Sequence, residues 1–317
     1  MKIVIVWATS RFSELSQQAT ANEIMAQVKL HYYQILYLQK AKSDLMQLDS
    51  LYKDFVRVAN LRYSIGETNL LEKTTAETKQ GELNLMLKQN ETELLSSYSS
   101  LKMLLNSADD FTIENTTAFS PLTIPASFDT VLIANNPSLK LLYQQSVIAE
   151  KNKKVETAQT LPDFNVGYFN QSIIGFQNVN GTDVFYDKTN RFTGFNVGIS
   201  VPLTFFSNAA KIKSLSLKQQ SLQKEADNGK HMLQAQLQNA FTQYNQNLLQ
   251  YNYYKAQALT NAETIIKTAT LGFSSGDIGY MEYAQALQNA TNIKLGYLQS
   301  INQLNQSIVN INFIINK

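Results

Sequence analysis

A nine-residue stretch of the chain occurs twice, 210 positions apart. Residues 59–67 read ANLRYSIGE, and residues 269–277 read ATLGFSSGD. Each copy interrupts a helical pattern with one glycine, Gly66 or Gly276, followed by an acidic residue. Glycine adopts the positive φ that ends many helices, and an acidic side chain suits the positive end of the next helix. Each copy therefore predicts the bend of a helical hairpin.

The match continues through the helical pattern that follows each bend. Of the 48 ungapped pairs from Ala59/Ala269 to Asn106/Asn316, 11 are identical. Because the match covers a whole helix as well as the bend, it indicates a duplicated unit. Internal repeats of this kind constrain the fold more than any local signal does.

The composition excludes several functional classes. The net charge is +2 and charged residues make up 16% of the chain, so no strong field favours nucleic acid as a partner. The absence of cysteine excludes disulfides, thiol catalysis and cysteine-based metal sites. His31 and His231 lie far apart in sequence, with no carboxylates grouped to form a site with them. The sequence therefore predicts no enzyme activity, no cofactor and no metal site.

Apolar residues recur at spacings of three, four and seven along most of the chain, which is typical of helices packed as in coiled coils. We expect helices over about residues 14–63, 69–106, 137–160 and 207–273, and a return helix after the second bend. Pro121 and Pro125 mark an irregular linker. Long hairpins bury little surface alone, so several copies are expected to associate side by side. The apolar start, residues 1–8, is too short for a convincing signal peptide.

Two segments alternate with the period of β-strands. Their apolar side chains face one side, opposite Asn, Gly and Ser: Phe164, Val166 and Tyr168 in the first segment, and Phe195, Val197, Ile199 and Val201 in the second. Residues 178–183, between them, are expected to form a loop. Such alternation fits a strand pair of an outer-membrane barrel, with lipid outside and water inside. An ordinary hairpin packed on a core fits the alternation equally well.

The order helix–strand–loop–strand–helix resembles the TolC-type outer-membrane efflux channels. The entry Leu161-Pro162, the exit Val201-Pro202-Leu203 and the duplicated Tyr/Phe-x-x-Gly bends carry the resemblance, which covers about residues 15–317. Residues 276–283 (GDIGYMEY) and 301–308 (INQLNQSI) are most similar to the channels of heavy-metal efflux systems, including channels fused to a resistance-nodulation-division (RND) pump.

The resemblance implies a mainly α fold of long antiparallel helical hairpins in a duplicated unit. In a homotrimer the helices would form an α-barrel across the periplasm, and the single β-hairpin would contribute to an outer-membrane β-barrel. The channel would passively conduct metal cations or small toxic compounds from an inner-membrane RND pump through a periplasmic adaptor. Whether the pump is separate or fused in the parent polypeptide stays open. Its partners would also include outer-membrane lipid. The alternative is a coiled-coil structural or adaptor protein of the cell envelope without a pore.

The resemblance also assigns candidate site residues. The adaptor-docking tips are Tyr63, Ser64, Gly66, Glu67, Phe273, Ser274, Gly276 and Asp277, and the candidate tip gate is Glu72, Glu282 and Gln285. The apolar strand residues named above would face lipid. Two simpler interpretations stay open: Glu72 and Glu282 pair with neighbouring Lys or Arg, or the bends are helix caps without a partner.

The chain departs from the family in one respect. The family has a strand pair in each repeat, whereas only the second repeat has one here, so the sequence is similar to an N-terminally incomplete member. We therefore expect an atypical segment over residues 1–13 and a first-repeat hairpin with linker over 14–135. The second repeat is expected over 136–317, with its β-hairpin at about 163–201.

Overall fold

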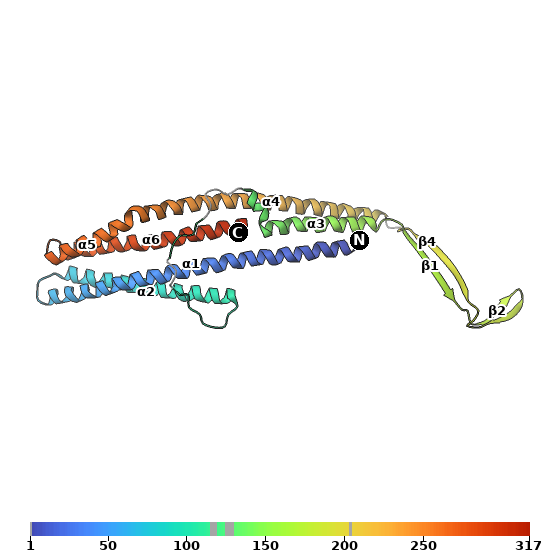
Figure 1. Cartoon of the computed structure of the whole chain (residues 1–317), viewed down its shortest axis with the longest axis horizontal. Helices are drawn as coiled ribbons and strands as arrows, with labels where there is room; N and C mark the ends of the chain where they lie inside the picture. Colours follow the sequence, from blue (N-terminus) through green and yellow to red (C-terminus); the bar gives the residue numbers. More distant parts are fainter. Residues whose placement is uncertain (1, 115–118, 124–129, 203–204) are drawn as a thin grey trace. The chain divides into compact units, whose positions relative to one another are not determined.

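The computed structural model describes residues 2–114, 119–123, 130–202 and 205–317. Figure 1 shows its helices and strands and labels most of them. They are α1 (Lys2–Ser64), α2 (Leu70–Leu105), the 3-10 turn η1 (Thr130–Asn135), α3 (Pro137–Ala158), β1 (Asp163–Gln171), β2 (Gly175–Val179), β3 (Thr182–Tyr186), β4 (Phe192–Ser200), α4 (Phe205–Tyr253), the π-helical turn η2 (Tyr254–Ala258), α5 (Leu259–Ser275) and α6 (Tyr280–Ile315). The predicted fold class, long helical hairpins with a strand pair, is confirmed. Pro125 of the expected linker and Leu203 of the expected strand exit lie outside the described residues.

The chain divides into two compact units. One comprises Met1–Glu14 and Leu141–Asn228, and the other comprises Leu15–Lys140 and Gly229–Lys317. The first unit contains all four strands and the second contains both helical bends. Within the residues described, no helix is both long enough and apolar enough to cross a membrane.

The first unit is organised around the antiparallel pair β1–β4. The register places Phe164 opposite Ile199 and Val166 opposite Val197, so the apolar residues of both strands share one face, as the alternation predicted. The predicted strands at about 163–201 are therefore confirmed. In the helical part of the same unit an ion pair links α4 to α3: Lys211 Nζ lies 2.8 Å from a carboxylate oxygen of Glu156.

The expected loop between the strands is wrong, because residues 175–186 form a second hairpin, β2–β3. Asn180 and Gly181, at its turn, have φ of 52° and 87°. Two consecutive positive φ angles are typical of the type I′ turn, for which Asn-Gly is a preferred pair. The Asn-Gly pair between short apolar stretches was the sequence signal for this hairpin.

The first helix also begins earlier than expected, at Lys2 rather than near residue 14. Residues 2–13 contain no glycine or proline that would stop a helix. Ala8 is buried, and its carbonyl accepts a hydrogen bond of 2.8 Å from the Gln144 side chain of α3. This contact within the first unit gives the start of the helix a packing partner that periodicity alone did not reveal.

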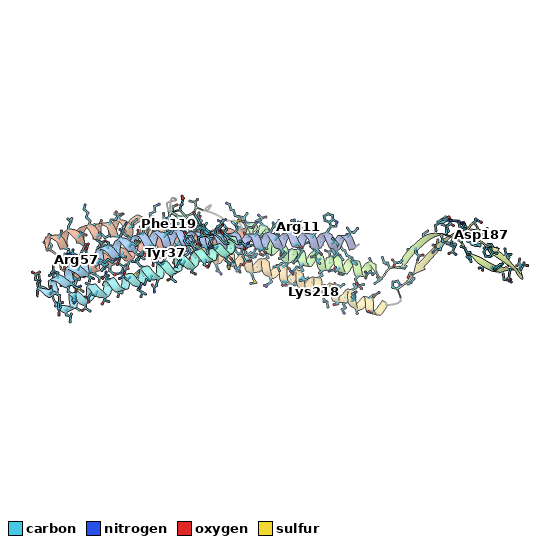
Figure 2. All side chains as sticks on the ribbon, turned by 90° about the horizontal axis from the view of Figure 1, so that it is seen from below. Arg11, Tyr37, Arg57, Phe119, Asp187 and Lys218 are labelled. Atoms are coloured by element: carbon cyan, nitrogen blue, oxygen red, sulfur yellow. The ribbon has the colours of Figure 1, made fainter. Side chains whose placement is uncertain are left out.

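The second unit packs two hairpins, α1–α2 and α5–α6, together with the described part of the linker. Phe119 of the linker lies with its ring centroid 6.5 Å from that of Tyr37 (Figure 2). Leu122 packs against a buried cluster that includes Ile301, Leu304 and Ile308 of α6. The linker thus covers part of the helical surface of this unit.

The helix expected over residues 207–273 contains a π-helical turn at Tyr254–Ala258. Such turns are irregularities in the hydrogen-bond ladder and occur often at functional sites. Tyr254 packs directly over Gly296 of α6: a Cβ atom at Gly296 would lie 2.4 Å from the Tyr254 hydroxyl and 2.7 Å from Cζ. Gly296 is therefore required for the close approach of the Tyr254 ring.

We expect opposite effects from two glycine substitutions within helices. Gly296→Ala should lower the free energy of unfolding by about 1–3 kcal/mol, because the added methyl collides with the Tyr254 ring. Gly81→Ala in α2 should raise it by about 0.5–1 kcal/mol, since a Cβ at Gly81 meets nothing within 4 Å and alanine favours helix. Denaturant titration followed by circular dichroism measures both, and equal shifts would contradict the packing of Tyr254 on Gly296.

Candidate functional site

The two bends have the same backbone geometry. Gly66 and Gly276 have φ of 78° and 82°. In each bend the amide that follows the glycine donates to the carbonyl four residues before the glycine, at 2.8 Å. This is the Schellman arrangement, in which a left-handed residue satisfies the last helical carbonyls. The helices that follow end alike as well, on the left-handed residues Asn106 and Asn316. The structure therefore supports the duplication predicted from sequence.

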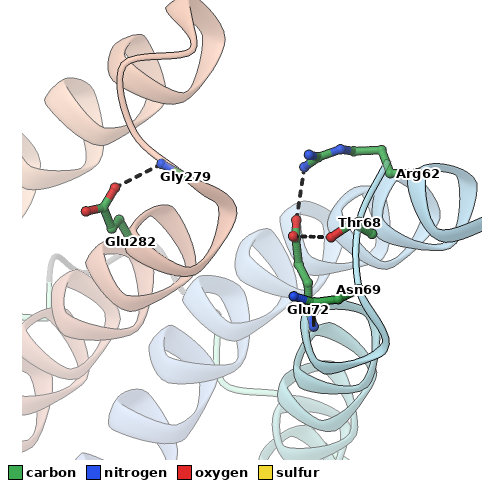
Figure 3. Close-up of polar contacts among 6 residues, drawn as sticks. All are labelled: Arg62, Thr68, Asn69, Glu72, Gly279 and Glu282. Carbon is green, nitrogen blue, oxygen red and sulfur yellow. Dashed lines mark hydrogen bonds and ion pairs between the residues drawn. The ribbon is translucent and has the colours of Figure 1, made fainter. Parts of the chain in front are cut away.

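Glu72 and Glu282 occupy the third position of the helix after each bend, but their contacts differ (Figure 3). Glu72 accepts a hydrogen bond of 3.0 Å from Arg62 Nη1 and another from the Thr68 hydroxyl. Its side chain is 15% exposed. The pairing of Glu72 with a neighbouring arginine, left open by the sequence, is what the structure shows.

Glu282 makes a cap instead of an ion pair. Its Oε2 accepts a hydrogen bond of 2.9 Å from the backbone amide of Gly279, the residue that caps α6 (Figure 3). Among the described residues, no Lys or Arg forms an ion pair with Glu282. Gln285, the third candidate gate residue, is exposed and donates to Asn289 at 3.0 Å. Of the three gate candidates, Glu282 therefore keeps a carboxylate that no described cation neutralises.

Matched substitutions should separate these two glutamates. Glu72→Gln removes the ion pair with Arg62 and should cost about 1 kcal/mol, or roughly 2 °C in the melting temperature. Glu282→Gln should leave stability within about 0.3 kcal/mol, because glutamine also accepts the bond from the capping amide. Thermal unfolding of the two variants measures the difference. A larger loss for Glu282→Gln would contradict these roles.

An aromatic cluster joins the two hairpins directly behind the bends. Phe55 of α1 lies between residues of α5 and α6, with ring centroids 4.7 Å from Tyr283, 5.1 Å from Tyr280 and 5.8 Å from Phe273. Phe273 and Tyr283 stack at 4.8 Å with an interplanar angle of 6°. The surrounding buried residues include Ala59, Ala76, Ala269, Ala284 and Leu287. This cluster fixes one bend relative to the other.

The buried hydroxyl of Tyr280 in this cluster lowers the stability of the fold. It is 4% exposed, and its hydroxyl has no hydrogen-bond partner among the described residues. Burial raises the pKa of Tyr280 from its usual 10.0, and the negative charge of Glu72 adds to the shift. Burial likewise raises the pKa of Tyr52 to about 12. Because both folded pKa values are raised, the neutral forms stabilise the fold fully below pH 10, and this stability is lost as pH rises toward the folded values.

Tyr280→Phe should therefore stabilise the protein by about 1 kcal/mol, since it removes a buried polar atom without a partner. The variant should also lose less stability than the parent between pH 9 and pH 11. Denaturant unfolding at several pH values tests both statements. A loss of stability at pH 7 would show that the hydroxyl has a partner.

The predicted docking residues differ in their accessibility. Tyr63 is 40% exposed, with Lys73 Nζ 5.1 Å from its ring centroid, whereas its repeat partner Phe273 packs into the aromatic cluster. Phe273 is thus placed mainly to join the hairpins. Ile65, inside the first predicted docking bend, is exposed. Sequence reasoning missed the other exposed apolar residues that flank the bends: Leu61, Leu70, Leu71, Leu271 and Met281. The signal was present, because apolar residues beside a solvent-exposed turn have no core to fill.

The apolar face of the β1–β4 hairpin is exposed in the chain. The seven predicted residues, Phe164, Val166, Tyr168, Phe195, Val197, Ile199 and Val201, are 49–79% exposed. This finding argues against the alternative of a hairpin packed on a core of the same chain. The two outer edges of this two-stranded sheet, one on each strand, are also left without a third strand among the described residues. The described residues therefore leave both the apolar face and the two strand edges of this hairpin uncovered.

The polar groups at the bends serve capping and do not form a recognisable reactive site. Ser274 Oγ donates to the Leu271 carbonyl at 2.8 Å, as Ser64 Oγ does to the Leu61 carbonyl at 2.7 Å. Over the described ranges, no three His, Asp or Glu side chains gather closely enough to hold a metal ion. What the bends can supply is a shaped surface with apolar side chains and carboxylates, those of Glu67, Asp277 and Glu282, that form no ion pair among the described residues.

Comparisons with protein-family models and with curated protein sequences gave no match. Solved structures do match. The chain aligns with the CmeC outer membrane channel of Campylobacter jejuni at a TM-score of 0.79 and 14% identity, covering 98% of this chain and 66% of CmeC. It aligns with VceC, an outer membrane protein of Vibrio cholerae, at 0.80 and 14%, covering 99% and 74%. For CusC, whose structures describe transmembrane channel formation, the values are 0.81 and 13%, with 98% and 72% covered.

The agreement extends over almost the whole chain, although the chain spans only about two thirds to three quarters of these proteins. At 13–14% identity the match concerns the fold. It includes long helical hairpins and a β-hairpin in one polypeptide, the combination predicted from sequence. The chain therefore has the fold of these outer-membrane channel proteins.

Proposed function

We propose that the chain is the outer-membrane channel subunit of a tripartite efflux system. The observation that carries the proposal is the β1–β4 hairpin, whose apolar residues are 49–79% exposed. An apolar sheet face of this kind is stable in lipid, and lipid requires that sheet edges be paired. Pairing with other copies of the chain would satisfy the strand edges and leave the apolar face in contact with lipid. The similar fold of CmeC, an outer membrane channel, supports the same role.

The proposed assembly is a homotrimer in the outer membrane that extends into the periplasm. Its bends would dock on a periplasmic adaptor, which connects the channel to an inner-membrane RND pump. The exposed apolar residues beside both glycines, such as Ile65 and Leu271, suit a docking surface. They are 59% and 60% exposed, so burying each stabilises a complex by about 1–2 kcal/mol. The pump supplies the energy, and the channel conducts solute passively.

The proposed gate rests on Glu282. Arg62 neutralises Glu72, whereas Glu282 makes only a capping bond. In a trimer, three Glu282 carboxylates brought together would repel one another and attract cations. Glu282→Gln should then change the conductance or the block of the channel by cations, with little effect on folding.

The proposed function is tested by conductance. Purified protein added to a planar lipid bilayer should give stepwise currents without nucleotide or a proton gradient. Protein that integrates into the bilayer and yields no current would overturn the channel role and favour a structural protein without a pore. The expected exported solutes are metal cations or small toxic compounds, as the sequence resemblance of residues 276–283 and 301–308 suggests.

A further inference from the structure

Two facing helical segments of the second unit contain no charged residue. Residues 232–254 of α4 and its continuation, and residues 295–316 of α6 and its C-cap, include no Asp, Glu, Lys, Arg or His. Each segment is roughly 33 Å long at 1.5 Å per residue. The stretch of α2 that matches α6 in the repeat, residues 85–106, contains four charged residues: Lys88, Glu91, Glu93 and Lys102.

These two segments form a groove lined by side-chain amides. Its walls are Gln243, Gln246 and Gln250 of α4, and Gln303, Gln306 and Asn310 of α6. Its floor is fixed by Asn247, which is 5% exposed and donates to the Gln303 carbonyl at 3.0 Å. Gln243 in turn donates to Asn247 Oδ1 at 3.1 Å. The groove is thus a built polar surface with an ordered base.

The opposite face of the same helix pair is covered by the chain itself. Asn305 of α6 accepts a hydrogen bond of 2.7 Å from the Leu122 amide and donates to the Ser120 carbonyl at 3.2 Å. Asn305 is two positions from Gln303, which places it about 200° around the helix from the groove. The linker therefore occupies one side of the pair, and the amide groove lies on the other side.

We propose that the amide groove lines the water-filled conduit, as a wall that does not select solutes by the sign of their charge. This inference rests on the proposed channel function and assigns residues and a substrate class to it. Amide side chains hydrogen-bond water and polar solutes of either sign, but they hold no ion by charge. The matching stretch of α2 also has no net charge, because its two Lys and two Glu side chains balance. Solutes of either charge pass this level, and any preference for metal cations lies in the pump or at Glu282.

The absence of cysteine allows a direct test. Gln246→Cys and Gln250→Cys introduce one thiol each into the groove, and Asn252→Cys places a control thiol on an exposed position about 200° around the helix from Gln250. Each variant is incorporated into a planar bilayer and treated with a cationic trimethylammonium methanethiosulfonate or an anionic sulfonate methanethiosulfonate. Current and the extent of modification are both recorded.

We expect both reagents to modify Q246C and Q250C and to reduce the current. Each rate is divided by the rate of the same reagent with a small free thiol in solution, because the attacking thiolate is anionic and reacts faster with the cationic reagent. The two normalised rates should lie within about threefold of each other, because charge-lined clefts shift local ion concentrations by tenfold or more and this groove has no charges. Modification of N252C should leave the current unchanged. Groove thiols that stay unreactive, as they would beneath a neighbouring copy, overturn the proposal. So do groove thiols that react without reducing the current, a ratio of the normalised rates above about ten, or an equal loss of current in N252C. If the parent protein conducts and the groove variants give one of these contrary results, only this inference is wrong. If the parent protein does not conduct, the proposed channel function is wrong as well.

Discussion

Phe55→Ala should open the end of the second unit that contains the bends. Phe55 is 6% exposed and contacts three other aromatic rings within 5.8 Å, so its removal leaves a cavity where the two hairpins meet. A buried phenylalanine truncated to alanine costs about 3–5 kcal/mol. Trypsin cleavage at Arg57 and Arg62 reports local opening and should accelerate by about 100-fold or more.

The matched control is Leu71→Ala near the start of α2, where the leucine side chain is 69% exposed. Its cleavage rate should stay within about threefold of the parent rate, because surface substitutions usually change stability by less than 0.5 kcal/mol. If Phe55→Ala is cleaved no faster than the control, the aromatic cluster does not hold the two hairpins together.

Charges placed on the exposed apolar residues of both bends should weaken adaptor binding. In the double variant Ile65→Asp with Leu271→Asp, two side chains that are 59% and 60% exposed become carboxylates. Loss of their burial in a complex removes about 2–4 kcal/mol of binding free energy, so affinity for the adaptor should fall by about 30-fold or more. Binding of the purified channel to its adaptor, measured by cross-linking and by surface immobilisation, gives the result.

Leu95→Asp provides the control for this prediction. Leu95 is 72% exposed and lies on α2 far along the sequence from both bends. The control should bind the adaptor as the parent does, and both variants should remain folded by circular dichroism. Equal binding by the double variant and the parent would show that the adaptor does not use these bends.

The sequence predicted the parts of the fold that depend on local signals. Helical spacing, the glycines of the bends and the period-2 alternation each have a direct cause in the backbone, and the structure shows the corresponding helices, bends and strand pair. The equal φ angles of Gly66 and Gly276 follow from the duplicated sequence. Even the register of β1 and β4 matches the expected shared apolar face.

The parts that the sequence missed depend on tertiary contacts or on a signal that was overlooked. The π-helical turn at Tyr254–Ala258 arises where the Tyr254 ring meets Gly296, which no local pattern encodes. Repeat symmetry suggested equal roles for Glu72 and Glu282. The second copy has Gly272 where the first has Arg62, so Glu282 lacks the ion pair of Glu72 and bonds the capping amide of Gly279 instead. By contrast, the β2–β3 hairpin could have been predicted from Asn180-Gly181.

The location and mass of the native protein test the central claim most directly. Cell envelopes are separated on a density gradient, and the protein is extracted from the outer-membrane fraction in mild detergent for a mass measurement. We expect recovery in the outer membrane, with a protein mass about three times that of the single subunit measured under denaturing conditions. A monomer released without detergent would contradict the proposed assembly.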